Sequence, residues 1–167
     1  DLWVGRISET LAEISGPVVI AAHSLGCHAF THWFEQASFL DRGKIGGALL
    51  VAPPDLTKLS SVSRVTGFDR SASFTSQVPI IVVGSDNDPY AQTAHVWRLS
   101  RQWDAQFVNA GPFGHINADS DIGDWPYGQY LLASLQTSTN AMLERDHIST
   151  STTKWPNREP RFGYQES

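Results

Sequence analysis

A single serine, placed between an apolar run and a helical segment, constrains the fold of this chain more than any other feature. Residues 17–21 (PVVIA) predict a buried strand and residues 25–36 predict a helix, with Ser24 between them. So tight a strand-to-helix turn requires small residues two before and two after the serine, and these are Ala22 and Gly26. Glycine is the usual residue at the first of these positions, where this chain has alanine. The arrangement is typical of a nucleophile elbow, which leaves a serine hydroxyl exposed at the end of a sheet.

Strands and helices alternate along the rest of the sequence. Further strands are predicted at 46–52 (GGALLVA), 78–84 (VPIIVVG) and 106–110. Helices are predicted at 2–14, 91–103 and 125–144, and a loop with a short helix at 53–78. Unbroken β-branched runs suit strands that are covered on both faces. We therefore expect an α/β fold with a doubly wound, mostly parallel sheet and helices on both faces.

The composition favours one domain and excludes several classes of partner. The chain has 167 residues, 41% of them hydrophobic and 17% charged, with a net charge of −5. An acidic chain without clustered Lys and Arg is not expected to bind nucleic acid. No segment approaches the roughly 18 apolar residues of a membrane span, and the single cysteine, Cys27, cannot form an internal disulfide. We expect no membrane association and a cytoplasmic location.

The composition changes near the C-terminus. From residue 149 onward the chain is rich in Ser, Thr, Pro and charged residues. We therefore expect one α/β domain over residues 1–146 and a disordered tail over 147–167.

A serine nucleophile on such a sheet needs an acid and a histidine later in the chain, in that order. Three of the six histidines come too early, His95 falls within a helical pattern, and His147 is near the tail. His115 remains, in a glycine-rich loop after the last predicted strand. The acid must lie in GSDNDPY, directly after the strand at 78–84, where Asp86 and Asp88 compete for the role.

At these residues the sequence resembles a known family. HSLG after an apolar strand, then VAP, GSDNDPY, GHIN and GDWPYG resemble the small serine hydrolases that include retinoblastoma-binding protein nine and bacterial YdeN-like proteins. The resemblance covers most of residues 1–135. It implies a triad of Ser24, Asp88 and His115, and so selects Asp88 over Asp86. It also implies esterase-like activity on small acyl substrates, with no metal or organic cofactor.

Simpler structural roles compete with these assignments. Ser24 or Asp88 could cap a helix, and His115 could be satisfied by backbone groups within its loop. His28 and His32 lie one turn apart, but without a third ligand nearby we expect a packed or solvated pair rather than a metal site. The run from Asn117 lacks the glycine and glutamate of a calcium loop. Apolar and aromatic side chains at the start of the last helix are expected in its core: Trp125, Tyr127, Tyr130, Leu131, Leu132 and Leu135.

The developing oxyanion of an acyl transfer needs hydrogen-bond donors. The backbone N–H of Leu25, at the start of a helix, is expected to supply one. A second donor is expected from a loop after an earlier strand, and residues 1–23 offer no such loop. We therefore expect that a strand and loop precede Asp1 in the intact protein, and that Val18 to Ile20 lie on an unpaired edge.

Three functions fit the sequence. The first is hydrolysis of small esters, with a small acyl compound as the substrate. The second is a non-catalytic interaction protein on a hydrolase fold, since fold does not fix function and a protein partner remains open. The third is an acyltransferase or thioesterase, which would use the same three side chains.

Overall fold

Four parallel strands form the centre of the molecule. The computed structural model describes residues 2–60 and 71–151. The strands are β1 (Val18–His23), β2 (Ile45–Val51), β3 (Ile80–Gly84) and β4 (Gln106–Asn109), and they lie side by side in the order of the sequence. Every neighbouring pair is parallel, so all four carboxyl ends meet at one edge of the sheet. The expected parallel α/β sheet is confirmed.

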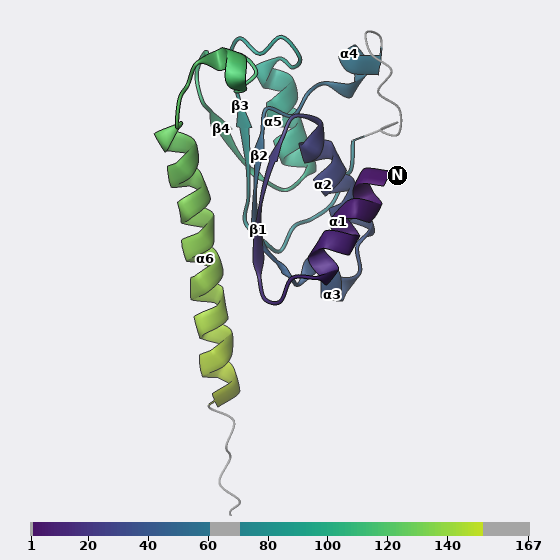
Figure 1. Ribbon diagram of the computed structural model, residues 1–167, viewed down its shortest axis with the longest axis vertical. Helices are drawn as coiled ribbons and strands as arrows, with labels where there is room; N and C mark the ends of the chain where they lie inside the picture. Colours follow the sequence, from purple (N-terminus) through teal and green to yellow (C-terminus); the bar gives the residue numbers. More distant parts are fainter. Residues whose placement is uncertain (1, 61–70, 152–167) are drawn as a thin grey trace, which may run out of the picture.

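Helices cover both faces of this sheet, giving the three layers seen in Figure 1. One face carries α1 (Leu2–Ala12), α2 (Leu25–Gln36) and α5 (Thr93–Gln102), and the other carries the long helix α6 (Pro126–Ser151). The remaining helices are short: α3 (Phe39–Arg42), α4 (Leu56–Ser60) and the 3₁₀ turn η1 (Ala118–Ser120). None of the helices within the described ranges is both long and apolar enough to cross a membrane.

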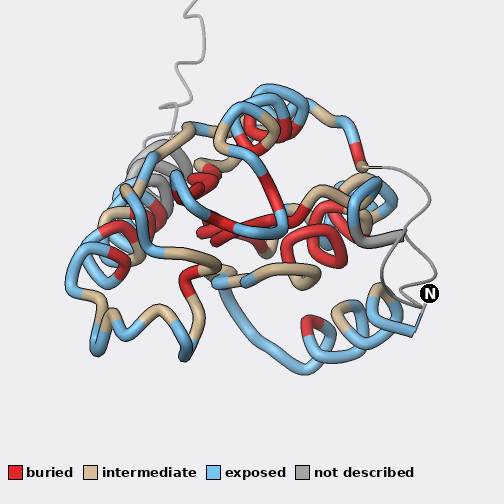
Figure 2. The backbone as a smooth tube through the Cα atoms, turned by 90° about the horizontal axis from the view of Figure 1, so that it is seen from above, coloured by how far each residue is buried: buried red, intermediate tan, exposed pale blue. Residues whose placement is uncertain are grey.

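Each face of the sheet has its own hydrophobic core. Phe30, Leu50 and Trp103 belong to the core under α2 and α5, and Leu49, Val83 and Leu135 to the core under α6. Seen from above, the buried residues gather in the strands and the inner turns of the helices, whereas α1 is largely exposed (Figure 2). Alternate residues of the strands thus enter opposite cores, as expected for a sheet covered on both sides.

Two glycines in β2 set the position of α6. A Cβ at Gly46 would overlap the side chain of Thr139, and one at Gly47 would lie 3.2 Å from Leu135. The Thr139 hydroxyl donates a hydrogen bond to the carbonyl of Gly46. Bare backbone at these two positions therefore allows the helix to approach the strand closely.

Strand β1 lies at the edge of the described sheet and pairs only with β2 among the described strands. Its residues Val18, Val19 and Ile20 are partly buried, packed against the cores on either face. The edge position expected for this strand is therefore confirmed for the described residues.

Several expectations about helix boundaries and burial need correction. Helix α6 continues to Ser151, seven residues past the predicted end, and residues 152–167 lie outside the described ranges. Leu131 and Leu135 are buried as expected, but Tyr127 and Tyr130 are exposed and stack on each other at 6.5 Å. They lie in the first two turns of α6, where the two rings stack on each other at the surface instead of entering the core.

Candidate active site

Ser24 lies in a sharp turn between β1 and α2. Its backbone has φ 55° and ψ −128°, a left-handed conformation that is strained for a residue with a Cβ. A Cβ added at Gly26 would lie 3.8 Å from that of Ala22, so the two small residues do face each other across the turn. The Ser24 side chain makes no hydrogen bond that caps α2. The capping alternative is therefore wrong, and the hydroxyl is available for another partner.

That partner is His115, in the loop after β4. Its Nε2 lies 2.9 Å from Ser24 Oγ, although 91 residues separate the two in the sequence. On the other side of the ring, Nδ1 lies 3.0 Å from Asp88 Oδ2 and 3.2 Å from Oδ1. A carboxylate only accepts hydrogen bonds, so Nδ1 carries the proton and Nε2 is free to accept the serine proton.

Asp88 is shielded from water in the loop that follows β3. Its side chain is 1% exposed and that of His115 is 10% exposed. The backbone N–H of Tyr90 donates a 2.8 Å hydrogen bond to Asp88 Oδ1. Helix α5 begins later, after Gln92, so Asp88 is not its N-cap as the simpler interpretation had it. The structure thus brings together the three residues that the resemblance selected.

Asp86, the competing acid, has other hydrogen-bond partners. Its Oδ1 accepts a 2.7 Å hydrogen bond from the side-chain amide of Asn109, and its backbone N–H donates to the carbonyl of Gly111. Asp86 therefore ties the acid loop to the end of β4.

Two residues that the sequence analysis did not single out also join the loops. Asn87 Oδ1 accepts the backbone N–H of Gly114 at 2.6 Å, and Ser85 Oγ accepts that of Phe113 at 3.0 Å. Both bonds hold the segment just before His115 against the acid loop. Ser and Asn are common in turns, so the residue types of Ser85 and Asn87 gave no signal that they would bind this loop.

The remaining candidates have structural surroundings. His28 is fully buried, its Nε2 donates to the carbonyl of Pro54, and burial lowers its pKa to about 4. Burial likewise raises the pKa of the Cys27 thiol well above its usual range, which makes this thiol unreactive. No group of three or more metal-ligating side chains occurs within residues 2–60 and 71–151. His28 is therefore a packed core residue, one of the two alternatives expected.

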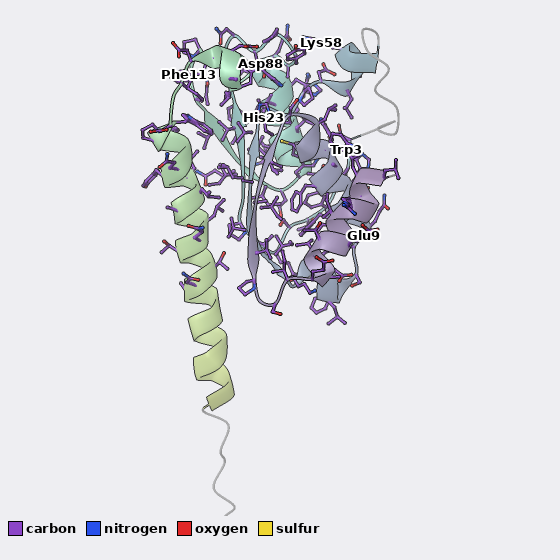
Figure 3. The ribbon with its side chains drawn as sticks, viewed as in Figure 1. Trp3, Glu9, His23, Lys58, Asp88 and Phe113 are labelled. Atoms are coloured by element: carbon purple, nitrogen blue, oxygen red, sulfur yellow. The ribbon has the colours of Figure 1, made fainter. Side chains whose placement is uncertain are left out.

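Two hollows flank the site. One, of about 340 Å³, is mainly apolar and is lined by residues that include His23, Leu49, Ile116 and Trp125. The other, of about 380 Å³, lies beside His115 and is lined in part by Tyr90, Phe113 and Asn117. In Figure 3 the labelled His23, Asp88 and Phe113 all lie toward the carboxyl ends of the strands, where parallel sheets place their sites. A third, apolar hollow of about 680 Å³ lies away from the site, between α1 and β1.

Comparison with known proteins identifies the family of this chain. The family model described as serine hydrolase matches residues 1–134, most of the chain. The chain belongs to the serine hydrolase family. It is similar to a YdeN-like hydrolase of Pectobacterium atrosepticum (30% identity, 84% of this chain and 69% of that one, TM-score 0.68). No curated protein matches the sequence significantly.

Other solved structures agree with this serine hydrolase in fold. The ydeN gene product of B. subtilis is 22% identical over 81% of this chain and 74% of its own, with a TM-score of 0.61. The esterase RhEst1 of a Rhodococcus species is 11% identical over 83% of this chain and 71% of its own, with a TM-score of 0.57. The expected YdeN-like relationship is confirmed, whereas the link to retinoblastoma-binding protein nine stays a prediction. The protein is an enzyme of the hydrolase type.

Proposed function

We propose that the protein hydrolyses small carboxylic esters, with Ser24 as nucleophile, His115 as general base and Asp88 as the group that orients the imidazole. The observation that carries this proposal is the continuous chain of contacts from Ser24 Oγ through both ring nitrogens of His115 to Asp88. Three separate loops supply these side chains. These contacts support the roles of a nucleophile, its base and an orienting acid.

The reaction follows from the hydrogen bonds. As Ser24 Oγ attacks the ester carbonyl, its proton passes to His115 Nε2, and Asp88 stabilises the imidazolium that forms. The imidazolium then gives this proton to the departing alcohol, which leaves an acyl group on Ser24. A water molecule, deprotonated by His115, hydrolyses the acyl-enzyme and restores the free serine.

The oxyanion that forms during each attack needs a donor close to Ser24. Leu25 is the first residue of α2, so its backbone N–H lies at the positive end of the helix dipole. We assign this N–H to the oxyanion, where one such donor contributes about 3 kcal/mol.

The surroundings of the site favour a small substrate. Hollows of about 340 and 380 Å³ lie at the low end of the range for small-molecule sites. The mainly apolar hollow lined by His23, of about 340 Å³, suits a short acyl chain. The other, next to His115, suits the alcohol that must receive the proton.

Covalent labelling tests the proposal directly. A fluorophosphonate probe should modify the native protein at Ser24, as identified by peptide mass spectrometry, and the same protein should turn over 4-nitrophenyl acetate. The Ser24→Ala variant is the matched control and should do neither. A folded protein that neither reacts nor hydrolyses a series of short-chain esters would contradict the proposal and favour an interaction protein.

The same assay separates the acyltransferase and thioesterase alternatives. Hydroxylamine as acceptor, or an acyl-CoA as donor, would be used in place of water or the aryl ester. A kcat/KM for acyl-CoA at least about tenfold above that for the matching aryl ester, corresponding to about 1.4 kcal/mol, would assign the enzyme to the thioesterases.

A further inference from the structure

His23, the residue before the nucleophile, contacts the backbone of His115. His23 Nε2 lies 2.8 Å from the His115 carbonyl oxygen, and the two rings lie 4.8 Å apart at an angle of 58°. A carbonyl oxygen can only accept a hydrogen bond, so His23 Nε2 carries a proton and donates a hydrogen bond to it. We propose that His23 is a positioning residue, which holds the backbone of His115 so that its imidazole stays between Ser24 and Asp88. This inference rests on the proposed function.

The backbone at this point needs such support. Ile116, directly after His115, has φ 48°, a left-handed conformation that is an outlier for a β-branched residue. Strained backbone of this kind persists only where surrounding contacts hold it in place. The hydrogen bond from His23 acts on the carbonyl of the peptide that joins His115 to Ile116, which is where the strain begins.

Two further contacts of the loop come from the acid loop. Asn87 and Ser85 bind the backbone N–H groups of Gly114 and Phe113, and so hold the segment before His115 to the acid loop. His23 holds the segment after the His115 Cα to the elbow strand. The histidine is therefore tied on one side to the strand that carries the nucleophile, and on the other to the loop that carries the acid.

A positioning role differs measurably from two alternatives. His23 is exposed and also lines the mainly apolar hollow, so it could instead contact the substrate. Loss of a substrate contact would raise KM, whereas a displaced general base lowers kcat and leaves KM unchanged. A residue that only supported the fold would lower the melting temperature and leave kcat of the folded protein unchanged.

The experiment compares variants with and without the donor. His23→Leu keeps most of the volume but has no N–H, and His23→Ala is a second variant without the donor. His23→Gln offers a side-chain N–H at a similar reach. We expect both donor-free variants to lose about tenfold or more in kcat for 4-nitrophenyl acetate, since small displacements of reacting groups are costly. KM should change less than about twofold, and His23→Gln should recover most of the lost kcat.

The measurements are kcat, KM, the rate of fluorophosphonate labelling and the melting temperature of each variant, with Ser24→Ala alongside. Labelling rates should fall in parallel with kcat, while melting temperatures stay within about 2 °C of the native value. An unchanged kcat in both donor-free variants, a loss that His23→Gln shares, or an effect confined to KM would each overturn the inference. Full activity of Ser24→Ala would instead overturn the proposed function itself.

Discussion

The side-chain amide of Asn109 donates a 2.7 Å hydrogen bond to Asp86. Asn109 ends β4 and Asp86 follows β3, so this bond joins the two loops that carry the acid and the histidine. The carboxylate of Asp88, in contrast, lies against His115. Two aspartates only two residues apart thus have separate partners.

This division predicts different costs for the same substitution at the two sites. Asp88→Asn should lower kcat by roughly 10⁴, because an amide favours the wrong tautomer of His115. Asp86→Asn should cost less than about tenfold, since its amide oxygen can still accept the hydrogen bond from Asn109. Steady-state kinetics of both variants with a short-chain aryl ester provides the comparison. The melting temperatures of the variants should match, so that a loss of kcat does not reflect unfolding. The reverse ranking would assign the acid to Asp86.

Removing the nucleophile should have the largest effect. Ser24→Ala should reduce ester turnover by at least about 10³, because the three side chains act as a unit. Its stability should stay close to native, because alanine keeps the Cβ of serine and the lost hydroxyl makes no hydrogen bond that caps α2. Turnover and urea denaturation of the same preparation test both statements. Activity within tenfold of native would contradict the assignment of Ser24.

The part of the site that is local in sequence could be predicted. The part that depends on contacts between loops distant in the sequence could not. The elbow is local, because Ala22, Ser24 and Gly26 determine one turn between a recognisable strand and helix. The choice between Asp86 and Asp88 depends on where Asn109, at the end of β4, and His115, in the loop after it, lie in space. No local sequence pattern predicts these positions. The resemblance supplied that choice, and in the structure Asp88 contacts His115.

The errors in the fold have a similar cause. Helical periodicity predicts a buried face for α6 but not how far that face extends over the sheet. Leu131 and Leu135 pack with residues of β2 and β3 in the core under α6, whereas Tyr127 is 47% exposed. Strand β4 was predicted to end at residue 110 and helix α5 to begin at 91, and each differs from the structure by one or two residues, as is usual at element ends.

Buried His28 predicts how stability depends on pH. Its pKa is about 4 in the folded protein, lowered by burial, against 6.5 for an exposed histidine. Between these pH values the unfolded chain binds a proton that the folded chain does not, so stability falls as pH falls from about 6.5 to about 4. The full loss is about 3 kcal/mol, at about 1.4 kcal/mol for each pH unit between the two pKa values.

The His28→Gln variant should show a shallower dependence in this range. Glutamine can donate to the carbonyl of Pro54, as His28 does, but does not titrate. Some slope should remain, because burial also lowers the pKa of His95. Urea denaturation of both proteins at several pH values between 4 and 7 gives the free energies of unfolding. Parallel curves for the two proteins would show that His28 does not contribute.

The contact between Gly128 and Trp125 predicts opposite effects of one substitution in two helices. A Cβ at Gly128 would overlap the Trp125 ring, which packs against the core under α6 and whose backbone has φ 44°. Gly128→Ala should therefore destabilise the protein by about 1–3 kcal/mol, despite the better helix propensity of alanine. Gly5, in the exposed helix α1, has no atom within 4 Å of the position of a Cβ, so it is the matched control. Gly5→Ala should stabilise by up to about 1 kcal/mol, because alanine favours the helix and its Cβ contacts no other atom.

Because Trp125 also lines the apolar hollow beside His23, Gly128→Ala should in addition raise KM for longer acyl esters. A Gly128→Ala protein as stable as Gly5→Ala would show that the Trp125 ring does not occupy this position in solution.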